Sequence, residues 1–575
     1  MNNKDISDIL FAVAEYFTMF DEPFKARAYE KVAESLSSFD NDIRKIYKDG
    51  GRKSLEEISG IGKGIAQTIE EYIQTGRVRE LESMRKKMPV NMEELRSIEG
   101  VGPKAIKTLY KKLKIKDVAT LKKAALAGKI QKLENFGVKS EQKILKGIEF
   151  FESSRGRFLL GEALPIARRI ADDLRNVSGV SRVEIAGSIR RWCETSGDID
   201  ILVEASNADA VMSTFTKRED VAHIIAHGET KSSVRLKDGI DVDVRVVAKK
   251  SFGAALIYFT GSKDHNVLLR SLAIKKKLKL NEYGLYNGAR IIAGATEEGV
   301  YKSLGISIPP PELREGKNEL KKVFTKLIGF QDLRGDFQTQ TDWTDGVDSI
   351  EAMVRTAKQL GHEYIAITDH TKSLAMTGGS DEKKLRRQMR EIDVLNKKIS
   401  GIQILKGAEV NIMRDGTLDI SDEVLGELDI VGAAVHSHFN LSESEQTERI
   451  MRAMSNPHID ILFHPTGRVL KKRDPYALDI DKIVAHAVAT GTVLEIDAHP
   501  WRLDLKDDHI KRGVDAGAMF SIDTDAHSLA ELSYLEYGIG QARRAGLSKN
   551  RVLNTLALPA LQKFLATPKQ KRHLL

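Results

Sequence analysis

The chain of 575 residues contains a single cysteine, Cys193, and no apolar run close to the roughly 20 residues that a membrane-spanning helix needs. One cysteine excludes a disulfide framework within the chain. The first residues, MNNKDISDILF, are polar and acidic, whereas a secretory signal peptide begins with a basic segment and continues with an apolar one. These absences predict a soluble, cytoplasmic protein with no membrane partner.

Length and charge describe a multidomain chain with two electrostatically different parts. A chain of 575 residues with 41% apolar residues has room for several folded cores. The net charge is +8, and the basic excess lies within residues 1–330, whereas residues 331–575 are slightly acidic. A basic front part favours binding of a polyanion, and an acidic back part is typical of metal-binding carboxylates.

Residues 5–85 have helical periodicity, and the same part of the chain begins a repeated motif. The segments LEEISGIGKGIAQTI (55–69) and LRSIEGVGPKAIKTL (95–109) align without a gap, and residues 133–145 form a weaker third copy. Each copy places glycines between two predicted helices, so that free N–H groups of the second helix face a phosphate. A single such hairpin is often only a turn, but the aligned pair and the basic residues 101–150 favour helix-hairpin-helix binding to the DNA backbone. The residues expected at the phosphates are Gly60, Gly62, Lys63, Gly64, Gly100, Gly102 and Lys104.

The stretch IAGSIRRWCETSGDIDILVE (185–204) combines a phosphate-binding turn with two carboxylates. Asp198 and Asp200 are two residues apart on a predicted strand, so they point to the same face, roughly 7 Å apart. Two carboxylates on one face repel each other unless a cation lies between them, and Mg²⁺ prefers such oxygen ligands. A lone Asp-x-Asp is more often a charged surface turn, but Gly-Ser-x-Arg-Arg just before it makes the pattern far more specific.

A further carboxylate is expected from the alternating strand IDVDVRVV (240–247). Asp241, Asp243 and Arg245 share one face of this strand. Three carboxylates can hold two Mg²⁺ ions about 3.5–4 Å apart, which is the arrangement for in-line phosphoryl transfer.

These motifs together resemble the family X DNA polymerases, the family of polymerase β. Gly-Ser-x-Arg-Arg followed by Gly-Asp-x-Asp resembles the nucleotidyltransferase signature, YFTGSKDHN (258–266) resembles the deoxynucleotide-binding turn, and NEYGLY (281–286) also matches. The resemblance covers nearly the whole chain. It implies transfer of a nucleotide from a dNTP to a primer 3′-hydroxyl on gapped or primer-template DNA, in short-gap filling during base excision repair, by a monomeric enzyme with two Mg²⁺ or Mn²⁺ ions.

The resemblance also assigns roles to individual residues. The catalytic metal ligands would be Asp198, Asp200 and Asp243, since the family pattern of carboxylate-x-Arg selects Asp243. Ser188, Arg191, Ser196 and Gly197 would bind the triphosphate. The remaining substrate residues would be Tyr258 and Phe259 at the sugar, Gly261 in the turn, Asn266 at the base edge and Arg270 toward the template. Lys263 would lie beside the incoming base, where polymerase β has an acidic residue, so a different dNTP affinity is expected.

The amino-terminal region resembles the small gap-binding domain of polymerase β, with one departure. Lys25 and Tyr29 match its phosphate-binding lysine and tyrosine. The lysine that forms a Schiff base in the family aligns with Thr68, which cannot form an imine. Deoxyribose-phosphate lyase activity of that type is therefore not expected, unless another amine such as Lys63 substitutes.

The carboxyl-terminal part alternates strands and helices, and most of its strands carry His, Asp or Glu near their ends. Strands are expected at 364–370, 403–410, 428–438, 459–465, 492–498 and 518–527. A single histidine at a strand end is more often structural, but a series of such strands favours a metal site at one end of a barrel.

This region resembles the PHP domain of bacterial and archaeal family X enzymes, a distorted (β/α)7-type barrel with Zn²⁺ or Mn²⁺ and 3′–5′ exonuclease and phosphoesterase activity. The matching ligands are Asp345, His370, Glu409, His436, His464, Asp525 and His527. Gln338 and Gln340 replace the histidines of the first motif, so we expect reduced metal occupancy and a weakened nuclease. The alternative is a domain that is retained to position DNA or to stabilise the polymerase.

The expected fold is therefore multidomain α/β. The expected domains are a small helical gap-DNA-binding domain (1–85), a second helix-hairpin-helix domain (86–150), a nucleotidyltransferase palm (151–250), a nucleotide- and template-binding subdomain (251–315), a linker (316–335) and the PHP domain (336–575). Two other readings stay open. One is a DNA phosphoesterase to which the front half delivers DNA, and the other is a DNA-binding scaffold without catalysis.

Overall fold

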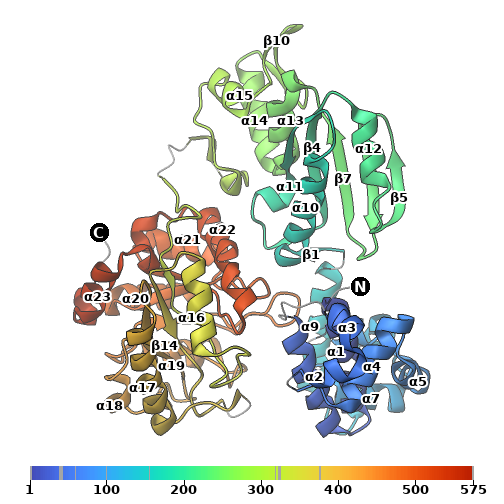
Figure 1. Ribbon diagram of the computed structural model, residues 1–575. Helices are drawn as coiled ribbons and strands as arrows, with labels where there is room; N and C mark the ends of the chain where they lie inside the picture. Colours follow the sequence, from blue (N-terminus) through green and yellow to red (C-terminus); the bar gives the residue numbers. More distant parts are fainter. Residues whose placement is uncertain are drawn as a thin grey trace. The chain divides into compact units, whose positions relative to one another are not determined.

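The computed structural model describes residues 3–37, 43–58, 60–96, 98, 100–154, 156–317, 319–321, 326–374 and 377–572 (Figure 1). The chain forms two compact units, one of residues 1–155 with 471–474 and the other of residues 156–470 with 475–575. Residues 318 and 322–325 of the expected linker lie outside the described residues. No helix in the described ranges is long and apolar enough to cross a membrane.

The amino-terminal part of the first unit is helical and is drawn in dark blue to cyan in Figure 1. Both hairpins have the same construction, because Gly60 (φ 87°) and Gly100 (φ 83°) adopt the left-handed conformation that glycine allows. A helix begins directly after Gly62 and after Gly102. The helices are α1 (Asn3–Met19), α2 (Pro23–Ser37), α3 (Ile43–Glu56), α4 (Lys63–Thr75), α5 (Arg79–Lys87), α6 (Met92–Arg96), α7 (Pro103–Leu113), α8 (Val118–Leu126) and α9 (Val138–Ser154).

The second unit begins with a five-stranded mixed sheet in the order β2-β4-β7-β6-β5. Its central strands β4 and β7 are parallel, and the other pairs are antiparallel. Alternate residues of β4 and β7, such as Ile199, Ile201, Val242 and Val244, are fully buried, which leaves the aspartates between them on the opposite face. The elements are α10 (Leu160–Arg175), β2 (Val180–Ile185), α11 (Gly187–Arg190), β4 (Asp198–Ala205), α12 (Ala208–Thr216), β5 (Val221–His227), β6 (Lys231–Leu236) and β7 (Asp241–Val246), with a two-stranded pair of β1 (Phe158–Leu159) and β3 (Thr195–Ser196).

A smaller subdomain follows the sheet. It pairs two helices with a three-stranded antiparallel sheet and a further short helix around a core that includes Leu269, Leu285 and Tyr301. Its elements are α13 (Phe252–Thr260), α14 (Lys263–Lys275), β8 (Lys279–Asn281), β9 (Gly284–Asn287), β10 (Arg290–Ala293) and α15 (Glu297–Ser303).

The carboxyl-terminal domain contains a seven-stranded parallel sheet in the order of the sequence, β11 to β17. A bridge between Thr339 and Ala526 connects the segments that follow the first and last strands, so the sheet is a nearly closed barrel. The strands are β11 (Gly335–Asp336), β12 (Tyr364–Ile367), β13 (Gln403–Asn411), β14 (Ile430–Ala434), β15 (Ile461–Leu462), β16 (Val493–Asp497) and β17 (Phe520–Asp523). The helices are α16 (Ile350–Gln359), α17 (Glu382–Lys398), α18 (Asp422–Leu425), α19 (Glu443–Met454), α20 (Ile480–Thr490), α21 (Asp507–Ala516), α22 (Leu535–Arg544) and α23 (Leu558–Ala566).

The predicted fold class is confirmed by helical hairpin domains, a mixed sheet and a parallel barrel. All six strands expected in the barrel are present. Strand β11 was not among the expected strands, because only two residues of the Arg-Gly-Asp segment are extended.

Candidate active sites

The palm carboxylates lie on the two parallel strands at the centre of the five-stranded sheet. Asp198 and Asp200 belong to β4, and Asp241 and Asp243 occupy the equivalent positions of β7. The register pairs Asp198 with Asp241 and Asp200 with Asp243. The three carboxylates predicted to bind metal are therefore neighbours on one face of the sheet.

Charge repulsion is only partly relieved at the centre of this group, because Arg245 and Lys231 oppose it without cancelling it. Burial raises the pKa of Asp200 to about 7, and the neighbouring charges of Asp198 and Asp243 add to that effect. Burial and Asp243 also raise the pKa of Asp198. Lys231 pairs with Asp243 at 3.0 Å, whereas Asp241 forms a two-pronged ion pair with Arg235 on the neighbouring strand. Asp241 is therefore held by a two-pronged pair with one arginine, whereas the charges of Asp198, Asp200 and Asp243 are only partly compensated and are chemically suited to divalent ions.

The turn before β4 is built against the same carboxylates. Gly187 has a φ of 62°, and a Cβ atom there would lie 2.6 Å from Asp200 Oδ2. The Ser188 hydroxyl contacts the Ser196 hydroxyl at 2.5 Å, and Ser196 also donates to the carbonyl of Asp198. Because Ser196 is fully buried, its observed contacts position Ser188 and the start of β4. Gly197 lies between this serine and Asp198.

The two arginines of the turn have different environments. Arg190 forms a two-pronged ion pair with Glu297, which also binds the fully buried Arg314. Burial opposes ionisation of Glu297, but Arg190 and Arg314 outweigh it and lower its pKa to about 2. Arg191, the predicted phosphate ligand, donates to the carbonyl of Thr260 and to Glu315. The carboxylate of Glu315 therefore occupies a donor of Arg191 in this structure.

The predicted sugar and base residues gather at the junction of α13 and α14. Tyr258 and Phe259 are in edge contact with their ring centres 5.0 Å apart, and Arg245 from β7 stacks on Phe259. Asn266 donates to the carbonyl of Tyr258. Tyr258, Asn266 and Arg270 line one small hollow together with Asn281. Gly261 (φ 69°) forms the turn, and Lys263 is the first residue of α14.

Residues of the first unit form a separate cluster. Tyr29 shares a hydrogen bond of 2.9 Å with Thr68, and both are buried. Lys25 lies over the ring of Phe17 and pairs with Glu22. Thr68 is therefore the hydrogen-bond partner of the predicted phosphate-binding tyrosine, and its hydroxyl occupies the position to which the resemblance assigns a lysine amine.

The barrel cluster is centred on Glu409, a buried residue of β13. One of its oxygens lies 3.0 Å from His436 Nε2 and 2.9 Å from His464 Nε2. The other lies 3.5 Å from His370 Nδ1. Burial acts to raise the pKa of Glu409, but the charge of His370 and the hydrogen bonds of His436 and His464 hold it well below its usual range.

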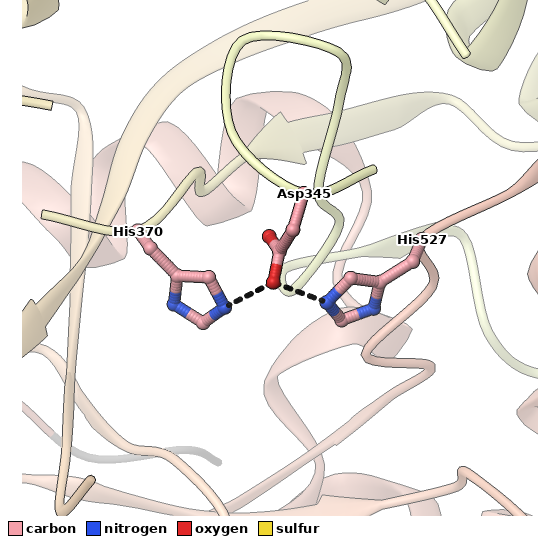
Figure 2. Close-up of side chains that lie close together, drawn as sticks. All are labelled: Asp345, His370 and His527. Atoms are coloured by element: carbon pink, nitrogen blue, oxygen red, sulfur yellow. Dashed lines mark ion pairs between the residues drawn. The ribbon is translucent and has the colours of Figure 1, made fainter. Parts of the chain in front are cut away.

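A second group of ligands adjoins the first through His370. Figure 2 shows one carboxylate oxygen of Asp345 between two imidazole rings, 3.6 Å from His370 Nε2 and 3.8 Å from His527 Nε2. Burial lowers the pKa of His527, but Asp525, Asp345 and Glu531 outweigh it and raise this pKa to about 9. Among the described residues, the ligand atoms of Asp345, His370 and His527, and those of His370, Glu409 and His436, lie within 4.8 Å of one another. Both groups therefore fit a metal ion.

The two glutamines that replace histidines also point at Glu409. Gln338 and Gln340 each donate an amide N–H to the same carboxylate oxygen, at 3.1 and 2.7 Å. Their carbonyl oxygens are buried without a hydrogen-bond partner, as are His464 Nδ1 and Asp525 Oδ1. Two predicted ligands, His464 and Asp525, have positive φ angles of 28° and 52°, and such strain is common at functional sites.

Arg502, which no sequence pattern indicated, brings a cation to this cluster. Its Nε lies 3.3 Å from Asp525 and 3.5 Å from Asp497. Burial raises the pKa values of three acidic residues, Glu495, Asp497 and Asp523, well above their usual range. The segment after TVLEIDA, which contains Arg502, carries no metal-binding motif. Only the number of acidic residues near this segment could have indicated that Arg502 has a charged partner.

Comparison with known families locates four matches along the chain. A model of the helix-hairpin-helix domain matches residues 1–78, and a model of the SAM-like helix-hairpin-helix tandem matches residues 92–149. The model of the DNA polymerase beta thumb matches residues 255–315, and that of the PHP domain matches residues 336–495.

Curated relatives match the whole chain or its last part. DNA polymerase/3′-5′ exonuclease PolX of Bacillus subtilis (strain 168) is 36% identical over 572 residues, which are 98% of this chain and 99% of that protein. A probable phosphatase of Thermoanaerobacter sp. (strain X514) is 30% identical over 233 residues, which are 39% of this chain and 90% of that protein. The chain belongs to the family X DNA polymerases that carry a carboxyl-terminal PHP domain.

Proposed function

We propose that this chain is a DNA-directed DNA polymerase that fills short gaps, with Asp198, Asp200 and Asp243 as its catalytic metal ligands. The observation that carries the proposal is the in-register placement of these carboxylates on β4 and β7, where Asp200 has a pKa of about 7. An acidic group whose repulsion is only partly compensated in this way is suited to binding divalent cations. Two Mg²⁺ or Mn²⁺ ions, when bound, supply activation of the primer 3′-hydroxyl and neutralisation of the leaving pyrophosphate.

The protein residues bind and orient the nucleotide. Ser188 and the backbone of the turn at Gly197 contact the triphosphate, and Arg191 exchanges Glu315 for a phosphate oxygen. Tyr258 and Phe259 pack against the sugar, with Phe259 held in place by Arg245. Asn266 and Arg270, which share one hollow with Tyr258, face the base edge and the template. Lys263, at the first turn of α14, lies near the incoming base.

Primer extension on a duplex with a one-nucleotide gap tests the metal assignment. With Mg²⁺ or Mn²⁺ and one dNTP, Asp198→Ala and Asp243→Ala should reduce extension to background. Asp241→Ala is the matched control, because Asp241 lies on the same strand but pairs with Arg235. Extension by Asp243→Ala at the wild-type rate, or its loss in Asp241→Ala, would refute the assignment of the third ligand.

The proposed repair role depends on the helical unit. Backbone N–H groups and cations for DNA phosphates come from Lys25 and from the two hairpins. The residues of the first hairpin are Gly60, Gly62, Lys63 and Gly64, and those of the second are Gly100, Gly102 and Lys104. We expect a 5′-phosphate on the downstream strand to increase affinity for gapped DNA, and Lys25→Ala to remove that increase. Equal affinities with and without the phosphate in the wild type would refute the gap-binding part of the proposal. The enzyme is proposed to act as a monomer.

For the barrel we propose a 3′–5′ exonuclease or phosphoesterase site that binds fewer metal ions than its histidine-rich relatives. His370 joins two groups of potential Zn²⁺ or Mn²⁺ ligands, which supports metal binding. The side chains of Gln338 and Gln340 oppose metal binding on their side of Glu409. A glutamine carbonyl is a weak metal ligand, and the amide N–H groups of both glutamines already occupy one oxygen of the Glu409 carboxylate.

Restoring both histidines separates the alternatives for this domain. Metal analysis of the purified protein should show more bound metal in Gln338→His/Gln340→His than in the wild type, together with faster Mn²⁺-dependent digestion of a 3′ end. Unchanged metal content and digestion would indicate that the glutamines do not limit the site. Digestion without extension in the wild type would favour the phosphoesterase reading, and DNA binding with neither activity would favour the scaffold reading.

A further inference from the structure

The barrel helix α22 (Leu535–Arg544) lies directly against the turn that is proposed to bind the nucleotide triphosphate. Both segments belong to the same compact unit of residues 156–470 and 475–575. The turn closes on itself, since the backbone N–H of Cys193 donates to the carbonyl of Ser188. Three residues of α22 contact the end of this turn. Gly540 and Gln541 contact Trp192, and Arg544 contacts Arg191.

Trp192 fits α22 closely. Its backbone has a φ of 55°, a conformation that costs a non-glycine residue energy unless its surroundings maintain it. The indole lies on Gly540, where a Cβ atom would be 2.5 Å from the ring, and it also contacts Tyr537 and Phe330. Gln541 donates to the carbonyl of Trp192 at 2.9 Å. The barrel thus maintains the strained end of the turn.

Arg544 connects the barrel to the phosphate-binding arginine. Its guanidinium donates to the backbone carbonyl of Arg191 at 2.9 Å and to Glu315 at 2.8 Å, while Asp507 holds its other side. Arg191 donates to the same oxygen of Glu315 at 3.1 Å. Two arginines, one from the palm and one from the barrel, therefore share a single carboxylate.

We propose that α22 of the PHP barrel positions the triphosphate-binding turn of the polymerase, with Arg544 as the positioning residue that leaves Arg191 free to bind nucleotide. This inference rests on the proposed polymerase function. When a triphosphate draws Arg191 away, Glu315 keeps Arg544 as its partner and is not left as an uncompensated charge. Without Arg544, Glu315 has only Arg191, so nucleotide binding must break the remaining ion pair.

Steady-state gap filling with the full chain tests this role, with KM for dNTP and kcat measured separately. Arg544→Ala should raise KM about ten-fold, which corresponds to the loss of one charge-assisted contact, and should leave DNA affinity unchanged. Arg544→Lys should recover only part of the effect, because an ammonium group cannot reach Glu315, Asp507 and the Arg191 carbonyl together. Glu536→Gln is the matched control, since Glu536 on the same helix pairs with Arg168 of the palm, away from the turn.

A pair of glycine variants keeps the test informative if Arg544→Ala does not fold. Gly540→Ala directs a methyl group at Trp192 and should raise KM, whereas Gly538→Ala directs one at Ile522 and Ala498 inside the barrel and should lower only the melting temperature. An unchanged KM in Arg544→Ala and Gly540→Ala would overturn the inference, as would an equal rise in Glu536→Gln. Absence of extension in the wild type would instead refute the polymerase function itself.

Discussion

Replacing Asp200 with asparagine should stabilise the metal-free protein while it abolishes nucleotide transfer. The pKa of Asp200 is about 7 in the folded protein and 3.8 as the ordinary value of an aspartate. Burial is the main cause, and the charges of Asp198 and Asp243 add to it. An amide in this place has no charge to desolvate and none to repel its neighbours, so the variant removes the cost of ionising Asp200.

The size and the pH range of the effect follow from that shift. Between about pH 4 and pH 7 the unfolded chain releases this proton while the folded protein retains it, so the wild type loses stability as the pH rises. A difference of about three pKa units corresponds to about 4 kcal/mol at most, fully developed above pH 7. The stability advantage of Asp200→Asn should therefore be small near pH 4, grow up to pH 7 and then remain constant.

Urea unfolding in EDTA at a series of pH values, with wild type and variant side by side, measures this difference. Contributions from the buried acids of the barrel cancel, because both proteins contain them. Asp241→Asn is the control, since the ion pair of Asp241 with the exposed Arg235 is screened by solvent and contributes little to stability. A pH-independent difference between Asp200→Asn and wild type would refute the electrostatic reasoning, and so would a loss of stability in the variant above pH 7.

Four further predictions concern the helical unit and the substrate pocket. Lys104→Ala should weaken DNA binding equally for all sequences and lower the slope of log affinity against log salt by about one, measured by anisotropy titrations. Gly100→Ala, at a φ of 83°, should lower the free energy of unfolding by about 1–2 kcal/mol in thermal unfolding and should also weaken DNA binding. If neither quantity changed, the hairpin would not need a residue in the left-handed conformation at this position. Thr68→Val should cost about 1–2 kcal/mol, because it leaves the buried hydroxyl of Tyr29 without its side-chain partner. Tyr258→Ala should increase incorporation of ribonucleotides relative to deoxynucleotides, and an unchanged ratio would remove Tyr258 from the sugar pocket.

Local patterns predicted much of the fold because they are set by neighbouring residues. The alternation of apolar and polar residues in 240–247 predicted the strand that carries Asp243. The repeated glycines predicted two hairpins, in which Gly60 and Gly100 have the same left-handed backbone conformation. The ends of the barrel strands placed His370 and Glu409 close together, as expected for parallel strands in one sheet. Each of these inferences needs only the geometry of a strand or of a tight turn.

The contacts that the sequence did not predict join distant segments. Arg544 and Glu315 are 229 residues apart, and Arg502 meets Asp525 from a different loop. Arginine and glutamate are common on any helix surface, so neither residue type indicates such a partner. The same applies to Thr68, whose contact with Tyr29 depends on how α2 and α4 pack.

The two proposed metal sites differ in how their carboxylates are compensated, and this difference explains why they should respond differently to metal. Asp200 has two acidic neighbours, so a cation there removes repulsion that the protein itself leaves in place. Glu409 already accepts from Gln338, Gln340, His436 and His464, and these donors must turn away or lose a contact before an ion binds. Metal should therefore raise the melting temperature through the palm at lower concentration than through the barrel. Asp200→Asn should remove the first stabilisation step in a Mn²⁺ titration, and Glu409→Gln should remove only the second. A single step that Glu409→Gln abolishes would show that the barrel binds metal more tightly and would contradict this order.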